Sequence, residues 1–221
     1  MKLEEKLITI DGPSASGKGL ASRSVAMSLN FKLLDSGLLY RAYAYLYSKT
    51  ADHPLAFAEF NRLQFSYLDN KETLIIEDAI DITSKLRTQE IAKHASIVSA
   101  DPVTRQNLLS IQRSFISNEG LVADGRDMGS VVFPHALTKI FLTASVEERA
   151  QRRFLELQNI GQEVNMRDLI AEIEQRDSND INRKISPLVQ PQDATVIDTT
   201  SLEPKEVVEK ILSIHRLNQN N

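Results

Sequence analysis

A glycine-rich loop near the start of the chain carries the residue types that bind a phosphate. Gly12-Pro-Ser-Ala-Ser-Gly17-Lys18 matches the pattern G-x-x-x-x-G-K, between an apolar run and a segment of helical periodicity. Glycines let successive backbone N–H groups turn inward as an anion nest, and the following helix adds partial positive charge at its N-terminus. Lys18 would reach the outer phosphates of a nucleotide. A glycine turn with a surface lysine is the alternative, but strand, spacing, lysine and helix all favour a nucleotide-binding loop. Its residues are Gly12, Pro13, Ser14, Ala15, Ser16, Gly17, Lys18, Gly19 and Leu20.

Position 19 separates this loop from two large classes of nucleotide-binding protein. GTPases and most ATPases place Ser or Thr there to ligate Mg²⁺, whereas this chain has Gly19. The sequence also lacks the Asn-Lys-x-Asp motif that reads guanine. We therefore expect a kinase in which the nucleotide phosphates and water hold the metal ion.

Polar side chains follow the second predicted strand. Asp35, Ser36 and Arg41 come directly after the apolar segment that begins at Phe31, at the end of a strand where open α/β sheets bind ligands. Arginine grips phosphate through two parallel hydrogen bonds. The alternative interpretation is a helix cap at Ser36 and a solvated arginine, and the residues alone do not decide between the two.

A second polar turn follows the apolar run Leu121-Val-Ala. Arg126 and Asp127 belong to the turn Asp-Gly-Arg-Asp at this predicted strand end. An Asp-Gly-Arg turn is common, so a purely structural role for it remains open, with Asp127 acting as a cap. Asp124, which begins the turn, is a candidate for contacting Mg²⁺ through water.

A helical segment from about Val146 carries an arginine series. Arg149, Arg152 and Arg153 share one face of this helix, and Glu148 is placed to pair with Arg152 at i,i+4. A salt-bridged face in solvent is the usual explanation of such a series. The polar stretch LQNIGQEVN, which contains Gly161, follows this helix and suits the hinge of a mobile lid.

Three more charged residues recur at helical spacing further along. Arg176, Asp180 and Arg183 fall on one face of a predicted helix. They would line a cleft or, equally, face water.

The hydrophobic pattern indicates the fold that must position these groups. Short apolar runs near residues 7–10, 31–35, 121–124, 137–143 and 194–198 alternate with helical patterns, which predicts a parallel sheet covered by helices on both faces. Two β-like runs around Asn70-Lys71 predict a hairpin, in an insertion near residues 63–95. The C-terminal LNQNN is expected to be a frayed tail.

Composition limits the classes of function. The chain of 221 residues has a formal net charge of -4, which argues against broad binding to nucleic acid or an anionic membrane. It contains no cysteine, so disulfides and thiolate chemistry are excluded, and its four histidines form no ligand pattern. We expect no metal ion held by protein ligands alone. The N-terminal MKLEEKLITI has no signal-peptide pattern, so we expect a cytoplasmic protein.

Six blocks in order along the chain resemble bacterial cytidylate kinases, which are P-loop nucleoside monophosphate kinases. The blocks are ITIDGPSASGKG, LLDSGLLYR, LRTQEIAKHAS, ADGRDMGSVVFPHA, KIFLTASVEERAQRR and EIEQRDSNDINR. The resemblance implies transfer of a phosphoryl group from ATP to CMP or dCMP with Mg²⁺, by a monomer. It also implies a core at 1–35, 100–150 and 185–217, an NMP-binding region with an insert at about 36–99, and a lid at about 151–184. Leu20 departs from the family, which commonly has Thr or Ser there.

The resemblance also implies roles for individual residues. The residues that would act on the transferring phosphoryl group are Lys18, Arg126, Arg149, Arg152 and Arg153. The acceptor would bind to Asp35, Ser36, Arg41, Ser96, Arg105, Arg126, Asp127, Arg176, Asp180 and Arg183. Within this set, Asp127 would accept a hydrogen bond from the amino group of cytosine, with Ser96 and Arg105 completing the base site.

Two other functions remain open from the residues. One is a kinase with UMP or AMP as acceptor, and the other is a P-loop switch protein that binds ATP and signals by conformation. The arginine series argues against the switch, because extra cationic groups suit a second phosphorylated ligand. Testing several acceptors in one assay would separate these functions.

Overall fold

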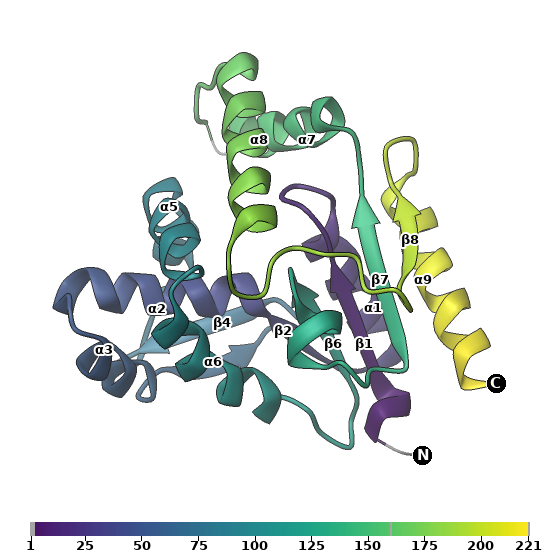
Figure 1. The fold of residues 1–221 in the computed structure, drawn as a ribbon, viewed down its shortest axis with the longest axis horizontal. Coiled ribbons are helices and arrows are strands. Elements are labelled where there is room, and N and C mark those ends of the chain that lie inside the picture. Colours follow the sequence, from purple (N-terminus) through teal and green to yellow (C-terminus); the bar gives the residue numbers. More distant parts are fainter. Residues whose placement is uncertain (1–2, 160, 221) are drawn as a thin grey trace.

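The computed structural model describes residues 3–159 and 161–220, and Figure 1 shows their arrangement. The helices are η1 (Leu3–Lys6), α1 (Lys18–Leu29), α2 (Ser36–Thr50), α3 (His53–Phe60), α4 (Thr83–Leu86), α5 (Gln89–Val98), α6 (Pro102–Ser114), η2 (Met128–Val132), α7 (Val146–Asn159), α8 (Met166–Asn182) and α9 (Pro204–Gln219). The strands are β1 (Leu7–Asp11), β2 (Lys32–Asp35), β3 (Gln64–Tyr67), β4 (Thr73–Glu77), β5 (Ile80–Asp81), β6 (Leu121–Gly125), β7 (Thr138–Thr143) and β8 (Thr195–Asp198).

The centre of the molecule is a five-stranded sheet in the order β2-β6-β1-β7-β8. Every neighbouring pair in it is parallel, as the alternation of apolar runs and helical patterns predicts. β1 is the middle strand, and its Leu7 pairs with Leu121 while its Asp11 pairs with Gly125. The fold class expected from the sequence is confirmed.

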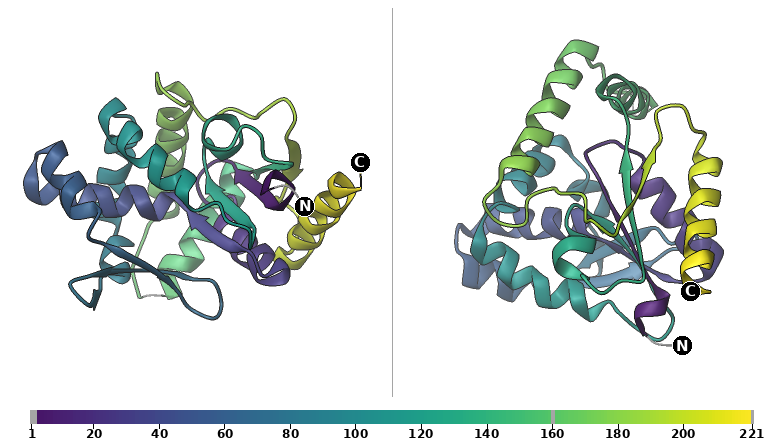
Figure 2. Two further views of the ribbon diagram at one scale, coloured as in Figure 1. Left: turned by 90° about the horizontal axis from the view of Figure 1, so that it is seen from below. Right: turned by 45° about the vertical axis from the view of Figure 1, so that its right-hand side comes forward.

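Helices cover both faces of this sheet, so its strands are apolar on both sides. Ile8 and Ile10 of β1 pack with α1 and α9 in one core cluster. Leu7 belongs to the other cluster, which α2, α6 and η2 help to form. Figure 2 shows α9 beside α1 on one side of the sheet and α2 on the other. Successive residues of β1 therefore serve opposite cores, as the two-residue period of a strand requires.

Because all five strands run in the same direction, their carboxyl ends meet at one edge. Asp35, at the end of β2, pairs in register with Asp124 of β6. The glycine-rich loop after β1 lies at the same edge, between β6 and β7. Gly12 begins this loop at φ +148°, and a Cβ there would lie 2.0 Å from the carbonyl oxygen of Leu142 in β7. Only glycine therefore fits between the loop and its neighbouring strand.

The insertion predicted near residues 63–95 forms a second, antiparallel sheet in the order β3-β4-β5. Tyr67 pairs with Thr73 across the turn, and Lys71 in the turn has a φ of 60°. The predicted hairpin is confirmed. The insert is attached to the central sheet by the Tyr67 hydroxyl, which donates to the carbonyl of Leu33 at 2.7 Å.

The helices α7 and α8, which we call the arm, pack against each other above the carboxyl edge of the sheet (Figure 1). Of the LQNIGQEVN stretch that joins them, Ile160 lies outside the described residues. Gly161 has φ +74°, and a Cβ built there would meet no atom within 4 Å. A hinge in this segment stays a prediction.

Two local predictions were wrong. Asp35, not Ser36, caps α2: its carboxylate accepts from the N–H of Leu38 at 2.9 Å, while Ser36 is the first helical residue. The expected C-terminal tail is helical as far as Gln219, because the side chain of Asn218 donates to the carbonyl of Leu137 at 3.2 Å. A tertiary contact thus extends a helix whose sequence has no strong helical pattern there. In the described residues, no helix is long and apolar enough to cross a membrane.

Candidate active site

The glycine-rich loop joins β1 to α1 and borders a cavity at the carboxyl edge of the sheet. Ala15 and Gly17 have φ values of 57° and 87°, and Gly17 immediately precedes the first residue of α1, Lys18. Lys18 is only 6% exposed. Its Nζ donates to the carbonyl of Pro13 at 2.5 Å and lies 3.2 Å from the Ser16 hydroxyl. The lysine is therefore folded back over its own loop, where an incoming phosphate would meet it.

The charges around Lys18 are strongly perturbed. Burial, and next the charge of Arg126, lower the pKa of Lys18 to about 7. Burial raises the pKa of Asp124 to about 7, although Lys18 opposes that shift. Burial also raises the pKa of Asp11 to about 6, while its carboxylate accepts from the N–H groups of Met128 and Gly129. Perturbed groups that converge in a cleft are typical of functional sites.

Asp11 links the two turns at the edge of the sheet. Its carboxylate oxygens lie 2.8 and 2.7 Å from the backbone nitrogens of Met128 and Gly129. A Cβ at Gly129 would come within 2.8 Å of the Thr9 hydroxyl. The turn that carries Arg126 and Asp127 is thus held directly against the end of β1.

A group of arginines faces the cavity beside this turn. Arg126 Nε donates to Asp180 of α8 at 2.9 Å. Arg41 of α2 donates to the carbonyls of Leu86 and Thr88 at 3.0 and 3.3 Å. Among the described residues, Arg176 has no hydrogen bond or ion pair, and burial and the charge of Arg126 lower its pKa to about 10. The charge of Asp180 offsets this shift only in part. A guanidinium without a direct partner, beside two other arginines, is suited to an anionic ligand.

Asp127 lies at the centre of a second polar group. Its side chain is only 3% exposed and forms an ion pair with Arg105 of α6. Arg183, which follows α8, lies 3.9 Å from the other carboxylate oxygen. Arg105 also donates to the carbonyl of Ser99 at 3.0 Å. The side chain of Asp127 makes no hydrogen bond that caps η2, although its backbone carbonyl accepts from the N–H groups of Val131 and Val132. The interpretation of the Asp127 side chain as a cap is therefore wrong.

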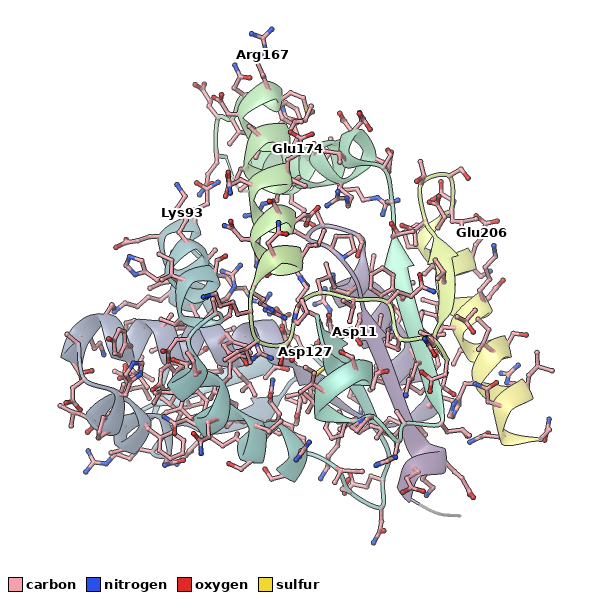
Figure 3. All side chains as sticks on the ribbon, in the orientation of Figure 1. Asp11, Lys93, Asp127, Arg167, Glu174 and Glu206 are labelled. Atoms are coloured by element: carbon pink, nitrogen blue, oxygen red, sulfur yellow. The ribbon has the colours of Figure 1, made fainter. Side chains whose placement is uncertain are left out.

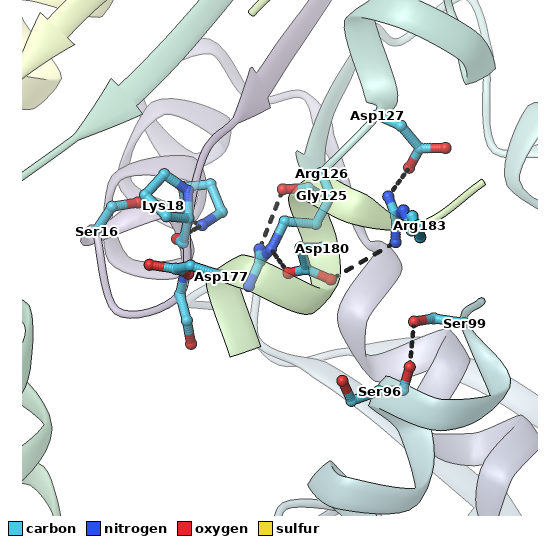
Figure 4. Close-up of polar contacts among 12 residues, drawn as sticks. Ser16, Lys18, Ser96, Ser99, Gly125, Arg126, Asp127, Asp177, Asp180 and Arg183 are labelled. Atoms are coloured by element: carbon cyan, nitrogen blue, oxygen red, sulfur yellow. Dashed lines mark hydrogen bonds and ion pairs between the residues drawn. The ribbon is translucent and has the colours of Figure 1, made fainter. Parts of the chain in front are cut away.

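Figure 4 shows how α8 connects these groups. Asp180 lies between Arg126 and Arg183, with its second oxygen 3.7 Å from Arg183. The Nη2 atom of Arg183 is buried and has no hydrogen-bond partner among the described residues. A buried orphan donor costs free energy unless a ligand or water satisfies it. This atom therefore marks a place for a polar ligand atom.

Two serines lie at the same cavity. The Ser36 hydroxyl is buried and accepts from Gln112 at 2.8 Å. Ser96 of α5 lies one turn before Ser99, whose hydroxyl donates to the Ser96 carbonyl at 2.9 Å. Both residues line the cavity.

The arginines of α7 have different surroundings. Arg149 is 4% exposed and donates to the carbonyls of Ala144 and Ser14 and to the carboxylate of Asp177. Arg152 pairs with Glu148 at 2.9 Å, the i,i+4 pair expected from the sequence. It also donates to the carbonyl oxygen of Thr199 at 2.6 Å.

Within residues 3–159 and 161–220, Arg153 forms its ion pair with a residue of its own helix. It pairs with Glu156 at 3.0 Å, and its side chain is about one-third exposed. Figure 3 shows the arm with its charged side chains above the sheet edge.

One cavity of about 860 Å³ joins nearly all of these residues. From the sequence prediction, its lining includes Ser14, Ala15, Ser16, Gly17, Lys18, Gly19, Leu20, Asp35, Ser36, Arg41, Ser96, Arg105, Arg126, Asp127, Arg152, Arg153, Arg176, Asp180 and Arg183. Gly12, Pro13 and Arg149 are not part of the lining. The roles of individual residues stay predictions.

Sequence reasoning missed several residues of this lining. Arg87 lies in the block LRTQEIAKHAS, and Thr199 follows the last strand of the sheet, so both had a signal in the sequence. Arg23 on α1 had none beyond its helical position. Both arginines lie near Glu72 of the insert, at 3.8 Å for Arg23 and 3.5 Å for Arg87. Only the position of the insert brings these three side chains together.

Comparison with known proteins decides the family. The family model described as cytidylate kinase matches residues 8–217. The chain belongs to the cytidylate kinase family. It is 47% identical over 218 residues to the cytidylate kinase of Enterobacter sp. (strain 638), covering 95% of each chain. It is 46% identical over 213 residues to that of Marinomonas sp. (strain MWYL1), covering 94% of each.

A solved structure titled "Crystal structure of TT1252 from Thermus thermophilus" has a TM-score of 0.45 and 17% identity, covering 94% of this chain and 95% of that one. The fold assignment rests on the sheet order and register and on family membership. The resemblance that the six sequence blocks indicate is confirmed by the match to the cytidylate kinase family.

Proposed function

We propose that this chain transfers the γ-phosphoryl group of ATP to CMP or dCMP, giving ADP and CDP or dCDP. One observation carries the proposal: a single cavity joins the phosphate loop to a buried carboxylate, Asp127, that is held between Arg105 and Arg183. The loop suits a donor, and the carboxylate suits a base that presents an amino group. Membership of the cytidylate kinase family supports the same assignment.

On the donor side, the loop from Ser14 to Leu20 binds the phosphates of ATP. Lys18 turns from the carbonyl of Pro13 toward the outer phosphates, where negative charge raises its pKa again. Arg152 and Arg153 approach from the arm. These groups neutralise charge on the transferring phosphoryl group, and such preorganised electrostatic stabilisation is the main contribution to catalysis of phosphoryl transfer.

On the acceptor side, Arg41, Arg126 and Arg176 bind the phosphate of the monophosphate. Arg176 supports this role because no carboxylate or carbonyl among the described residues occupies its guanidinium. Donor and acceptor are held in line, so the reaction needs no covalent intermediate on the protein. The arm must also exclude water, since an open site would hydrolyse ATP.

The base is read by Asp127. A carboxylate can accept at about four lone-pair positions, and Arg105 occupies one oxygen while Arg183 stays 3.9 Å from the other. Acceptor capacity is therefore left for the amino group of cytosine. Uracil would present a carbonyl oxygen at that position and would be repelled. The Nη2 atom of Arg183, which has no hydrogen-bond partner among the described residues, supplies a donor to the same ligand.

The residues fit a Mg²⁺ ion that arrives with the nucleotide. In the described part of the chain, no group of three or more His, Cys, Asp or Glu side chains is arranged to hold a metal. Gly19 has no hydroxyl, and its neighbour Asp124 lies 3.7 Å from the position of a Cβ there. Mg²⁺ usually keeps several waters and binds through one or two carboxylates plus substrate phosphates. Asp124 would hold it, and the ion would neutralise phosphate charge.

The expected division of the chain follows this assignment. The lid of about 151–184 comprises α8 and most of α7, the NMP-binding region with its insert is about 36–99, and the core is 1–35, 100–150 and 185–217. Family membership favours a cytoplasmic monomer, which gel filtration would test.

The test is ADP release measured in a coupled assay with CMP, dCMP, UMP, AMP or no acceptor. We expect CMP and dCMP to give rates well above those with UMP or AMP, and little release without an acceptor. A Lys18→Ala variant with an unchanged melting temperature should lose about 100-fold or more in turnover. UMP or AMP as the preferred acceptor would support the alternative kinases, and ADP release that ignores every acceptor would support the P-loop switch.

A further inference from the structure

The arm is attached to the rest of the molecule by polar contacts. None of the described residues of α7 and α8 belongs to either apolar core cluster. The buried apolar side chains of the arm, Ala150, Leu157, Leu169 and Ile173, belong to neither cluster, whereas ion pairs and hydrogen bonds join the arm to the sheet edge. One of these contacts falls on the phosphate loop itself.

Asp177 of α8 makes that contact. One of its carboxylate oxygens accepts from the backbone N–H of Ser14 at 3.2 Å. Its other oxygen pairs with Arg149 of α7, which in turn donates to the Ser14 carbonyl at 3.0 Å. Both backbone polar groups of Ser14 are thus held by the arm. Because Arg149 balances the charge of Asp177, this link brings no net charge to the loop.

The next turn of α8 faces the acceptor side. Asp180 lies three residues after Asp177 and pairs with Arg126 at 2.9 Å. Figure 4 shows Asp177 beside Ser16 and Lys18, and Asp180 beside Arg126. A helix transmits position between adjacent turns because its backbone hydrogen bonds leave little freedom. Fixing Asp177 on the loop therefore fixes Asp180 and Arg176 on the acceptor side.

We propose that Asp177 is a positioning residue that couples the two substrates: ATP orders the loop, and Asp177 carries that order through α8 to the acceptor site. The coupling is positive, because the second ligand meets an α8 that is already in place. This inference rests on the proposed function. A purely structural Asp177–Arg149 pair would stabilise the arm without linking the two binding events.

The experiment is a calorimetric titration of CMP into the full chain, with and without a saturating β,γ-imido analogue of ATP and Mg²⁺. In the wild-type chain we expect the analogue to lower the Kd of CMP about fivefold or more, within the usual range of coupling between sites. In Asp177→Asn, the Kd of CMP without the analogue should stay within about twofold of the wild type, and the analogue should lower it less than about twofold.

The matched control is Glu174→Gln, the same chemical change at an exposed position of the same helix (Figure 3). It should keep the wild-type coupling. Linkage supplies a second readout, because CMP must tighten binding of the analogue by the same factor in each variant. Should Asp177→Asn not fold, Arg149→Met removes the donors to Asp177 and to the Ser14 carbonyl from α7 and should also lower the coupling.

Three results would overturn the inference. They are a wild-type chain without coupling, an Asp177→Asn chain with full coupling, and an Asp177→Asn chain whose CMP binding is weakened equally with and without the analogue. Full coupling in Arg149→Met would overturn it in the same way. A wild-type chain that does not bind CMP at all would instead refute the proposed function, so the two failures are distinguishable.

Discussion

Replacing Asp127 by asparagine tests how the base is selected. The wild-type carboxylate is almost completely buried between Arg105 and Arg183. Asparagine has nearly the same shape but can rotate its amide so that an N–H faces the base. The variant would then donate to the carbonyl of uracil, where the wild type repels it, and would lose acceptor strength toward the amino group of cytosine.

The expected magnitude follows from a single paired contact. A well-placed pair of hydrogen bonds to a base edge discriminates by about 1–3 kcal/mol. At about 1.4 kcal/mol for each factor of ten, the ratio of kcat/KM for CMP to that for UMP should narrow by about fivefold to about 140-fold. The ratio should narrow mainly because kcat/KM for CMP falls more than kcat/KM for UMP. We also expect a lower melting temperature, because two buried arginines lose the negative charge between them.

The assay is coupled ADP release with CMP and with UMP for the wild type and Asp127→Asn. The ratio is measured within one variant, so a general loss of stability or of active enzyme cancels. An unchanged ratio in a folded variant would refute the reasoning and move base selection to other residues of the cavity.

Three further predictions follow from the site and the fold. Arg41→Ala and Arg126→Ala should each raise the KM for CMP strongly and the KM for ATP little. If the two KM values rose equally, these arginines would instead bind ATP or stabilise the fold. Lys18 has a pKa of about 7 in the free protein, so above pH 7 it is mostly neutral, and phosphates that favour its charged form should cause proton uptake. Calorimetry at pH 8.5 in two buffers should detect that uptake with ATP, while Lys18→Arg, which stays charged, should show less; equal uptake would contradict the assignment. Gly12→Ala should prevent folding or lower the melting temperature severely, because its Cβ would overlap the backbone of β7. Gly161→Ala should cost only about 1 kcal/mol of left-handed backbone strain. Similar melting temperatures for the two variants would contradict the packing argument.

Local pattern was sufficient for the parallel sheet and for the loop geometry. Apolar runs of strand length alternate with helical periodicity, and chain direction then requires the carboxyl ends of the strands to meet at one edge. The glycines and Lys18 therefore had to lie beside Asp35 and Asp124. The family also follows from the sequence, because the matching blocks extend almost from end to end.

Local pattern was insufficient where a partner lies far away in the chain. Asp35 was not expected to cap α2, since both Asp35 and Ser36 are good capping residues and only the backbone geometry separates them. Asn218 was assigned to a tail because its partner Leu137, just before β7, lies 81 residues earlier in the chain.

The sequence alone determined which side chains could bind phosphates and at which edge of the sheet they lie. Only the tertiary structure decided how these side chains pair. Periodicity places Asp177 on a helix but does not show that this helix returns to Ser14, 163 residues earlier in the chain. Likewise, nothing in the turn around Asp127 indicates that Arg105 and Arg183 enclose it. Such ion pairs depend on the relative positions of whole helices, which are set by packing against the sheet and not by the local sequence of either partner.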